Sequence, residues 1–155
     1  MAPRTFQVIA LTPPGLIDPS IAIAASRTGA TGILDLEYAT NDTAAQEAVK
    51  RLAAYGRERT GVKLGGWATD FSAKITPTLP ESISVVILTH SDPDQLFAQT
   101  QTLRREGRSI LLECVSLEEA RVGEQVGIHG LIAKGHEAGG EGLVKRPHLS
   151  CFSNS

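Results

Sequence analysis

Cysteine is scarce in this sequence: among 155 residues, the cysteines are Cys114 and Cys151. Two cysteines cannot build the disulfide framework of a small secreted protein, and such sparing use fits a reducing cytoplasm. They also lack the short Cys/His spacing of a zinc ligand set, so we expect no metal site. Cys114 is expected to be a small buried hydrophobic side chain rather than a nucleophile.

The sequence also lacks an excess of charge of one sign and any long apolar run. Its 15 basic and 17 acidic residues leave a formal net charge of −2, which disfavours nucleic acid and acidic membranes as partners. No apolar run approaches the roughly 18 residues of a membrane span. Pro13 and Pro14 interrupt the first apolar run, so we do not expect a secretory signal. These features favour a cytoplasmic protein with one domain.

Short apolar runs alternate with amphipathic stretches along the chain, roughly every 20–30 residues, which is the rhythm of parallel βα units. Strands are predicted at 6–11, 32–38, 62–67, 84–89, 109–115 and 128–133. Helices are predicted at 20–27, 41–56, 91–107 and, as a short helix, at 116–120, whereas 69–80 is expected to be irregular. The sequence therefore predicts an α/β fold of six parallel βα repeats.

Polar residues gather where the predicted strands end, and in parallel α/β folds binding sites form at that edge. The candidates are Asp35, Glu37, Trp67, Thr69, Thr89, His90, Glu113, Cys114, Lys134 and His136. Such a rim would suit a polar ligand. Two alternatives stay open: Asp35 and Glu37 could face solvent or cap a turn, and His90 could only help to close a helix start. His129 lies inside a strand and is expected to be structural.

A glycine-rich segment follows the last predicted strand, whereas the Gly-x-Ser-x-Gly, Walker A and Gly-x-Gly-x-x-Gly motifs are absent from the sequence. Residues 133–140 read Ala-Lys-Gly-His-Glu-Ala-Gly-Gly. Paired glycines after a strand allow backbone N–H groups to approach an anion closely. The alternative is a tight turn between strand and helix.

This glycine segment resembles the signature of the nitronate monooxygenase (2-nitropropane dioxygenase) family. The family includes FMN-dependent enoyl-acyl-carrier-protein reductases, and related domains occur in polyketide and polyunsaturated-fatty-acid synthases. Residues 8–15, Val-Ile-Ala-Leu-Thr-Pro-Pro-Gly, and 29–33, Gly-Ala-Thr-Gly-Ile, are similar to the family's first βα unit. The resemblance implies an FMN-binding TIM barrel. Because a closed barrel typically needs about 250 residues, residues 6–140 would form an incomplete barrel of about six of the eight units.

The resemblance also implies site residues. Thr12, Pro13 and Pro14 would line the flavin, and Gly139 and Gly140 would lie beside it. Glu113 and Lys134 occupy rim positions from which they could contact flavin or substrate.

The catalytic base is left unassigned by the resemblance. The family usually has His directly after Ala-Gly-Gly, where the monooxygenases use it as the base, but this chain has Glu141. His136 lies nearby at a different position, so His136 and His90 are the candidates for the base. The departure favours the reductase or synthase-associated branch over nitronate oxidation.

The implied function is an FMN-dependent oxidoreductase, with NAD(P)H as reductant and a small-molecule or acyl-carrier-bound substrate. One alternative is a non-catalytic half-barrel that self-associates as a homo-oligomer to cover its open edges. Another is a small α/β domain that binds a phosphorylated ligand at its strand ends.

Residues 141–155 lack periodicity and are predicted to be an irregular tail. For one choice of codons from Val144 onward, the same letters read one base earlier encode Glu-Glu-Thr-Ser-Phe-Val-Leu-Phe-Gln-Gln-Leu. That peptide has the acids of a helix start in its first turn. The hypothesis is that the reading frame shifts between Gly140 and Val144, ahead of two further βα units. The gene sequence tests it, because the alternative frame must then stay open.

Overall fold

Six strands and their helices alternate along the chain in a computed structural model that describes residues 7–57, 59–65, 69–89 and 92–135. The strands are β1 (Ile9–Leu11), β2 (Thr31–Asp35), β3 (Thr60–Leu64), β4 (Ile83–Leu88), β5 (Ser109–Cys114) and β6 (Gly130–Ala133). The helices are α1 (Ser20–Arg27), α2 (Asp42–Tyr55), α3 (Thr69–Ile75), the 3-10 helix η1 (Thr76–Thr78), α4 (Pro93–Arg105) and α5 (Leu117–Val126).

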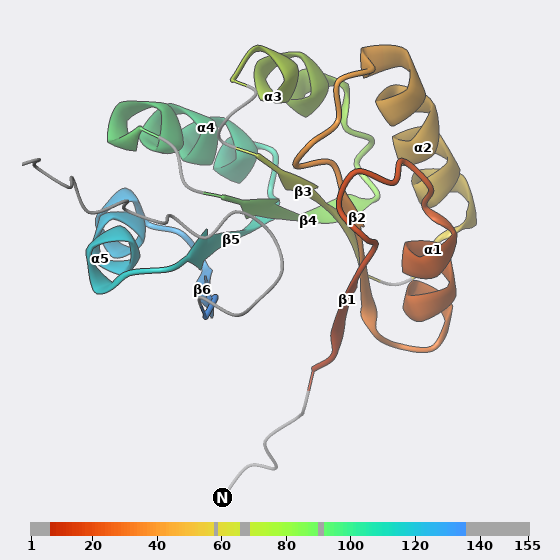
Figure 1. Cartoon of the computed structure of the whole chain (residues 1–155), viewed down its shortest axis with the longest axis horizontal. Coiled ribbons are helices and arrows are strands. Elements are labelled where there is room, and N and C mark those ends of the chain that lie inside the picture. The colour runs from red at the N-terminus through yellow and green to blue at the C-terminus, as the bar shows by residue number, and fades with distance from the viewer. Residues whose placement is uncertain (1–6, 58, 66–68, 90–91, 136–155) are drawn as a thin grey trace, which may run out of the picture.

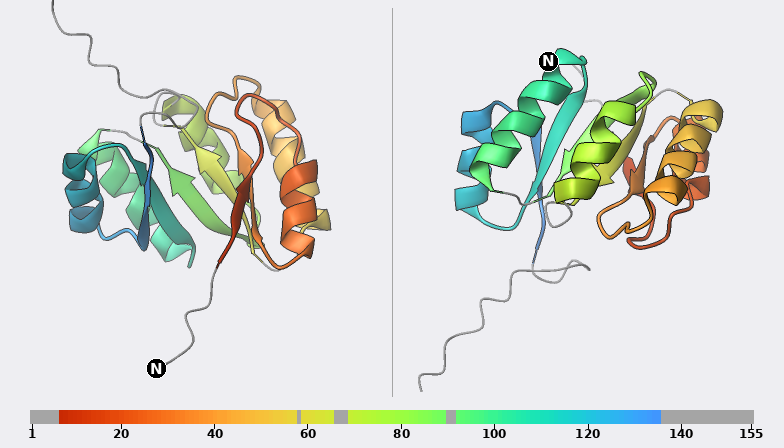
Figure 2. Two further views of the ribbon diagram at one scale, coloured as in Figure 1. Left: turned by 60° about the horizontal axis from the view of Figure 1, so that its bottom comes forward. Right: turned by 90° about the horizontal axis from the view of Figure 1, so that it is seen from above.

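All six strands belong to one parallel sheet, in which each strand pairs with the strand before it in the chain. The sheet is curled and the helices cover its convex face (Figure 1). The turned views show the same arrangement, with β1 and β6 at the two ends of the curl (Figure 2). This is the predicted α/β fold, an incomplete TIM barrel: within the described residues it has six parallel strands, and α1 to α5 follow β1 to β5 in turn.

The segment 69–80 is where the sequence-based expectation is wrong, because it contains α3 and η1 instead of irregular chain. Phe71 and Ile75 are four residues apart and therefore lie on one face of a helix. Both are buried, at 6% and 0% exposure, so packing stabilises a helix too short to be stable alone. Pro77 does not prevent this, since it lies at the start of η1, where its missing N–H is not needed.

The boundaries of other strands and helices differ less from the predicted ones. β2 ends at Asp35, where the prediction continued to residue 38, and β3 runs over 60–64 rather than 62–67. The helix expected at 116–120 extends to Val126 as α5. It ends at Gly127, whose φ of 78° is the left-handed conformation typical of a glycine after a helix.

The main core lies between the sheet and the helices. Alternate strand residues such as Leu34, Val62 and Val86 point to this side and are fully buried. Gly32 lets α1 approach β2 closely, because a Cβ there would lie 1.9 Å from the carbonyl oxygen of Ala22. In the part of the chain that the structure describes, no helix is long and apolar enough to cross a membrane.

The opposite, concave face of the sheet holds a smaller apolar cluster. Ile33, Val85 and Ile87 form its buried part, and Leu111 and Ile132 pack against it. Side chains on one face of a strand recur every second residue. The residues two positions after Ile33, Ile87, Leu111 and Ile132 therefore lie on the same concave face, nearer the carboxyl ends of the strands. They are Asp35, Thr89, Glu113 and Lys134. The concave face therefore changes from apolar to charged at the carboxyl end of the strands.

Candidate functional site

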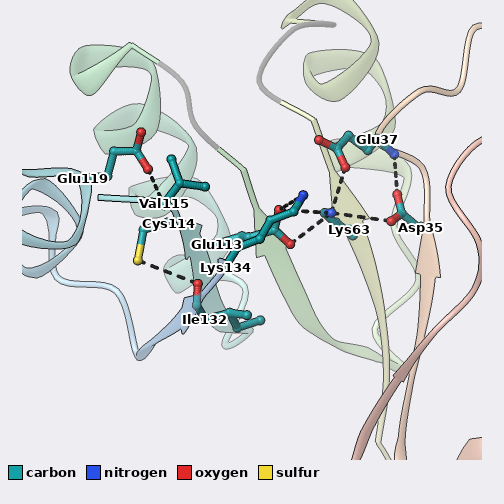
Figure 3. A network of polar contacts seen from close by, with 9 residues as sticks. All are labelled: Asp35, Glu37, Lys63, Glu113, Cys114, Val115, Glu119, Ile132 and Lys134. Atoms are coloured by element: carbon teal, nitrogen blue, oxygen red, sulfur yellow. Dashed lines mark hydrogen bonds and ion pairs between the residues drawn. The ribbon is translucent and has the colours of Figure 1, made fainter. Parts of the chain in front are cut away.

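Five charged side chains meet at the carboxyl end of the curled sheet (Figure 3). Asp35 ends β2 and Glu37 follows it, Lys63 lies in β3, Glu113 lies in β5, and Lys134 follows β6. We call these five residues the ion cluster. Its members lie in or directly after β2, β3, β5 and β6, so it can form only when these strands are assembled in one sheet.

Lys63 is at the centre of the ion cluster. Its Nζ lies 2.7 Å from Oε2 of Glu37, 3.1 Å from Oε2 of Glu113 and 3.6 Å from Oδ2 of Asp35. Glu113 in turn accepts a hydrogen bond from Nζ of Lys134 at 3.0 Å. Glu113 therefore joins the two lysines (Figure 3).

The ion cluster is largely removed from water: the five side chains are between 3% and 12% exposed. Burial disfavours the charged form of Lys63, but hydrogen bonds to Glu37 and Glu113 and the charge of Asp35 outweigh it and raise the pKa of the ammonium. Lys63 therefore stays protonated. When all five groups are ionised, three carboxylates and two ammonium groups leave one negative charge.

The carboxyl of Asp35 has a raised pKa, so burial favours its neutral form. Burial raises the pKa of its carboxyl, and the hydrogen bond from the Glu37 backbone and the charge of Lys63 offset only part of this effect. Desolvation thus dominates at Asp35, whereas ion pairing dominates at Lys63.

Backbone hydrogen bonds hold the carboxyl end of β2 in place. The hydroxyl of Thr12 accepts a hydrogen bond from the backbone N–H of Asp35 at 2.9 Å. The Asp35 carboxylate accepts one from the backbone N–H of Glu37, also at 2.9 Å. Thr12, in the loop after β1, is itself 2% exposed. The loop after β1 is therefore fastened to the end of β2, where Asp35 lies two residues before Glu37.

A cavity of about 320 Å³ opens above the ion cluster. One part of its wall is apolar and consists of Leu11, Pro14 and Ile132. The rest includes Thr12, Gly135 and the cluster itself. An apolar wall beside a few converging polar groups is the usual form of a small-molecule site.

The cavity brings together residues that the sequence analysis had selected from three separate parts of the chain: the loop after β1, the end of β5 and the segment after β6. Thr12, Pro14, Glu113 and Lys134 all line it. Pro13 lies in the same loop as Thr12 and Pro14, with an exposed side chain. Of the other candidates, Trp67, His90, His136, Gly139 and Gly140 lie outside the described residues, as does the tail at 141–155. Thr69 begins α3. Thr89 follows β4 and is not among the described residues that line the cavity.

The alternatives left open for Asp35 and Glu37 are now decided. Neither side chain faces solvent, since they are 3% and 6% exposed and both contact Lys63. Asp35 does in addition cap the turn that follows β2, through the backbone N–H of Glu37.

Two other candidates are structural. His129 accepts a hydrogen bond from the backbone N–H of Ile110 through Nδ1 at 3.0 Å, which joins the start of β6 to β5. Cys114 is buried, and its thiol lies 3.7 Å from the carbonyl oxygen of Ile132. Burial, together with the nearby carboxylates of Glu119 and Glu113, raises the pKa of this thiol. The burial of Cys114 confirms the expectation from the sequence, whereas His129 lies just before β6 and not inside a strand as predicted.

Lys63 is the member of the candidate site that the sequence analysis missed. It lies within a predicted strand, between the apolar residues Val62 and Leu64, and the sequence analysis considered only residues at strand ends. A charged residue inside a buried strand is a signal in itself, because lysine is almost never buried without a partner. Within the described ranges, no group of three or more His, Cys, Asp or Glu side chains could hold a metal ion. A lysine lies among the carboxylates instead.

No protein-family model matches the chain, and no curated protein matches it. Among solved structures, FabK from Thermotoga maritima is similar, with a TM-score of 0.64 and 23% sequence identity over 82% of this chain and 40% of that one. A single-substitution mutant of the same protein gives a TM-score of 0.70 and 24% identity over 86% of this chain and 45% of that one. At these identities the likeness concerns the fold alone. The chain spans less than half the length of the solved structures that it matches.

Proposed function

We propose that this chain belongs to an FMN-dependent oxidoreductase of the enoyl reductase type. The observation that carries the proposal is the convergence of Thr12, Pro14, Glu113 and Lys134 around one cavity. Thr12 and Pro14 were selected because the sequence resembles the nitronate monooxygenase and enoyl reductase family, and Glu113 and Lys134 were selected because they lie at the rim where predicted strands end. The cavity lies at the carboxyl end of parallel strands, where barrel enzymes bind their ligands.

The residues around the cavity fit the ring system of a flavin. Leu11, Pro14 and Ile132 offer an apolar surface for a flat ring. Lys134 donates one hydrogen bond to Glu113, and an ammonium has three donors. Two donors therefore remain for the carbonyl and ring-nitrogen edge of a flavin.

Bound FMN would supply the redox chemistry, with NAD(P)H as the reductant. The chain would bind and orient the ring through the loop at 12–14 and through Lys134, while the hydrogen bond to Glu113 holds the Lys134 side chain in place. Glu141, at the position of the family's usual His, supports reduction of an enoyl substrate, small or carried on an acyl carrier, rather than nitronate oxidation. The scarcity of cysteine supports a cytoplasmic setting.

The first test is binding. Purified protein is mixed with excess FMN, freed of unbound flavin by gel filtration, and examined by visible absorption. We expect retained flavin absorbance, and loss of that absorbance when NAD(P)H is added without oxygen. Complete release of FMN would contradict the proposal.

A matched pair of variants tests the site. Lys134→Met removes a charged hydrogen-bond donor from the cavity and should weaken FMN binding by at least about tenfold. Lys74→Met removes a lysine whose side chain is 63% exposed and should leave FMN binding unchanged. Equal affinities in the two variants would place the flavin elsewhere.

The edges of the sheet favour a second candidate, a half-barrel that self-associates. Within the described residues, the outer edges of β1 and β6 pair with no other strand. Ile9 and Leu11 in β1 are 38% and 39% exposed, and Leu131 in β6 is 49% exposed. Exposed apolar edge strands are typical sites of pairing between chains. Analytical ultracentrifugation over a range of concentrations tests this, and a monomer at all concentrations would exclude it.

A further inference from the structure

Lys63 forms part of the cavity wall, but its ammonium group is committed to the ion cluster. Its Nζ lies 2.7 Å from Glu37, 3.1 Å from Glu113 and 3.6 Å from Asp35, and an ammonium group has three donors. There is therefore one carboxylate for each donor. Lys63 is thus placed to act on its neighbours rather than on a ligand.

The carboxylate of Glu113 is shared between two lysines (Figure 3). Nζ of Lys63 lies 3.3 Å from Oε1 and 3.1 Å from Oε2 of Glu113, so it contacts both oxygens. Nζ of Lys134 donates to Oε1 at 3.0 Å. Lys63 therefore fixes the carboxylate by which Lys134 is held at the cavity.

Loss of Lys63 would change how Glu113 holds Lys134. The carboxylate would be free to rotate, and both of its oxygens could pair with the Lys134 ammonium. That pairing would be strong, because charges shielded from water attract each other more than they do in bulk solvent. The ammonium would follow the carboxylate and be drawn from its present position at the cavity.

We infer that Lys63 is a positioning residue for ligand binding: by fixing Glu113, it keeps the donors of Lys134 directed to the cavity. The inference rests on the proposed function, in which Lys134 binds the flavin ring. It adds a residue that acts on flavin binding through two other side chains, without contact with the flavin itself.

The test is a double-mutant cycle on the full chain, with FMN affinity as the readout. Kd is measured by quenching of flavin fluorescence for the wild type, Lys63→Met, Lys134→Met and the double variant, after circular dichroism has shown that each is folded. We expect Lys63→Met to weaken FMN binding by about threefold or more in the wild-type background. In the Lys134→Met background, where the residue it acts through is gone, the same substitution should change Kd by less than about twofold.

An equal loss of affinity in both backgrounds would overturn the inference, because Lys63 would then contact the flavin directly or only stabilise the fold. An unchanged Kd in the Lys63→Met single variant would also overturn it, and so would a Lys134→Met protein that binds FMN as tightly as the wild type. These outcomes leave FMN binding itself intact, whereas a wild type that releases all FMN would contradict the proposed function as well.

Two further variants test whether the charge of Lys63 is what matters. Lys63→Arg keeps a cation with several donors and should bind FMN more tightly than Lys63→Met by about twofold or more. Lys50→Met, at an exposed position of α2, should keep the wild-type Kd. A Lys63→Arg protein that binds FMN as weakly as Lys63→Met contradicts the inference.

Glu113→Gln keeps the inference testable if Lys63→Met does not fold. The amide lacks the charge that attracts both lysines, so the link between them is weakened and FMN binding should weaken by about threefold or more. The same substitution should have little effect in the Lys134→Met background. Unchanged or tighter FMN binding by Glu113→Gln would show that Lys134 needs no support from Glu113 and Lys63, and would overturn the inference.

Discussion

Lys63 and Glu113 are fifty residues apart in the chain and lie on strands that are not neighbours, yet Nζ of Lys63 is 3.1 Å from Oε2 of Glu113. β4 lies between their strands. Adjacent strands are about 4.8 Å apart, so in a flat sheet the two backbones would be about 10 Å from each other. The long lysine side chain therefore crosses the concave face above β4, and the ion pair links the two halves of the curl.

Removing the central cation should destabilise the fold strongly. Lys63→Met leaves Asp35, Glu37 and Glu113 buried without their shared partner. Loss of one member of a buried ion pair typically costs about 3–5 kcal/mol. Urea unfolding at neutral pH measures the change. Lys50→Met, at an exposed position of α2, is the matched control, and a difference between the two variants below about 1 kcal/mol would show that the cluster is not a stabilising unit.

Asp35 should make stability depend on pH in a defined direction. Because burial raises the pKa of its carboxyl above the ordinary 3.8, the folded state holds the proton where the unfolded state has lost it. As pH rises from 3.8 toward the raised pKa, the wild type should therefore lose stability relative to Asp35→Asn, by at most about 1.4 kcal/mol per pH unit. Above the raised pKa, the difference should stay constant.

Unfolding free energies of both proteins at a series of pH values check the sign. Asp94→Asn, at an exposed position in the first turn of α4, is the control and should show no such loss. If the wild type gained stability relative to Asp35→Asn over this range, the pKa of Asp35 would be lowered, and desolvation would not dominate there.

Arg108 should be irreplaceable by lysine. It is 7% exposed, and its guanidinium donates to the carbonyl oxygens of Leu79, Pro80 and Ile83 and to the carboxylate of Glu106. Lysine keeps the charge but lacks the planar fork that reaches several acceptors at once. Arg108→Lys should cost about 2–4 kcal/mol in thermal or urea unfolding. The exposed Arg105→Lys is the control; equal stabilities would mean that the carbonyls find other donors.

Gly32 should not tolerate a methyl group. An added Cβ would lie 1.9 Å from the carbonyl oxygen of Ala22, which is backbone and cannot turn aside. Gly32→Ala should therefore push α1 away from β2 and cost about 1–3 kcal/mol or more. Gly135→Ala, where a Cβ meets nothing within 4 Å, should change stability by less than about 0.5 kcal/mol. A stable Gly32→Ala protein would show that α1 can shift freely.

The fold was predictable from the sequence wherever a segment has a clear pattern of apolar residues. Buried strands such as Ile83–Leu88 and the apolar face of α2 have patterns that local chemistry explains. The helix at 69–75 was missed because its stability comes from burying Phe71 and Ile75 against the core, which two nearby prolines obscured. Tertiary packing determines that this segment is helical, and the local sequence pattern cannot show such packing.

The position of the candidate site was predictable from the sequence, but the ion pairs between its side chains were not. Strand ends identified Asp35, Glu37, Glu113 and Lys134, since parallel strands present their carboxyl ends at one edge. That Lys63 lies among three of these residues depends on the curl of the sheet, which brings β3 and β5 within reach of one side chain. Curvature is a property of the assembled sheet, and no single segment encodes it.

The consecutive strand order bears on how the chain folds during its synthesis. Each strand pairs with its predecessor, so the sheet can grow in the order in which the ribosome releases it. Lys63 finds Asp35 on the strand already formed, but Glu113 emerges fifty residues later, a delay of about 3–10 s at typical elongation rates. Over that interval the nascent sheet lacks the ion pair that spans β4, which can form only after β5 has been added.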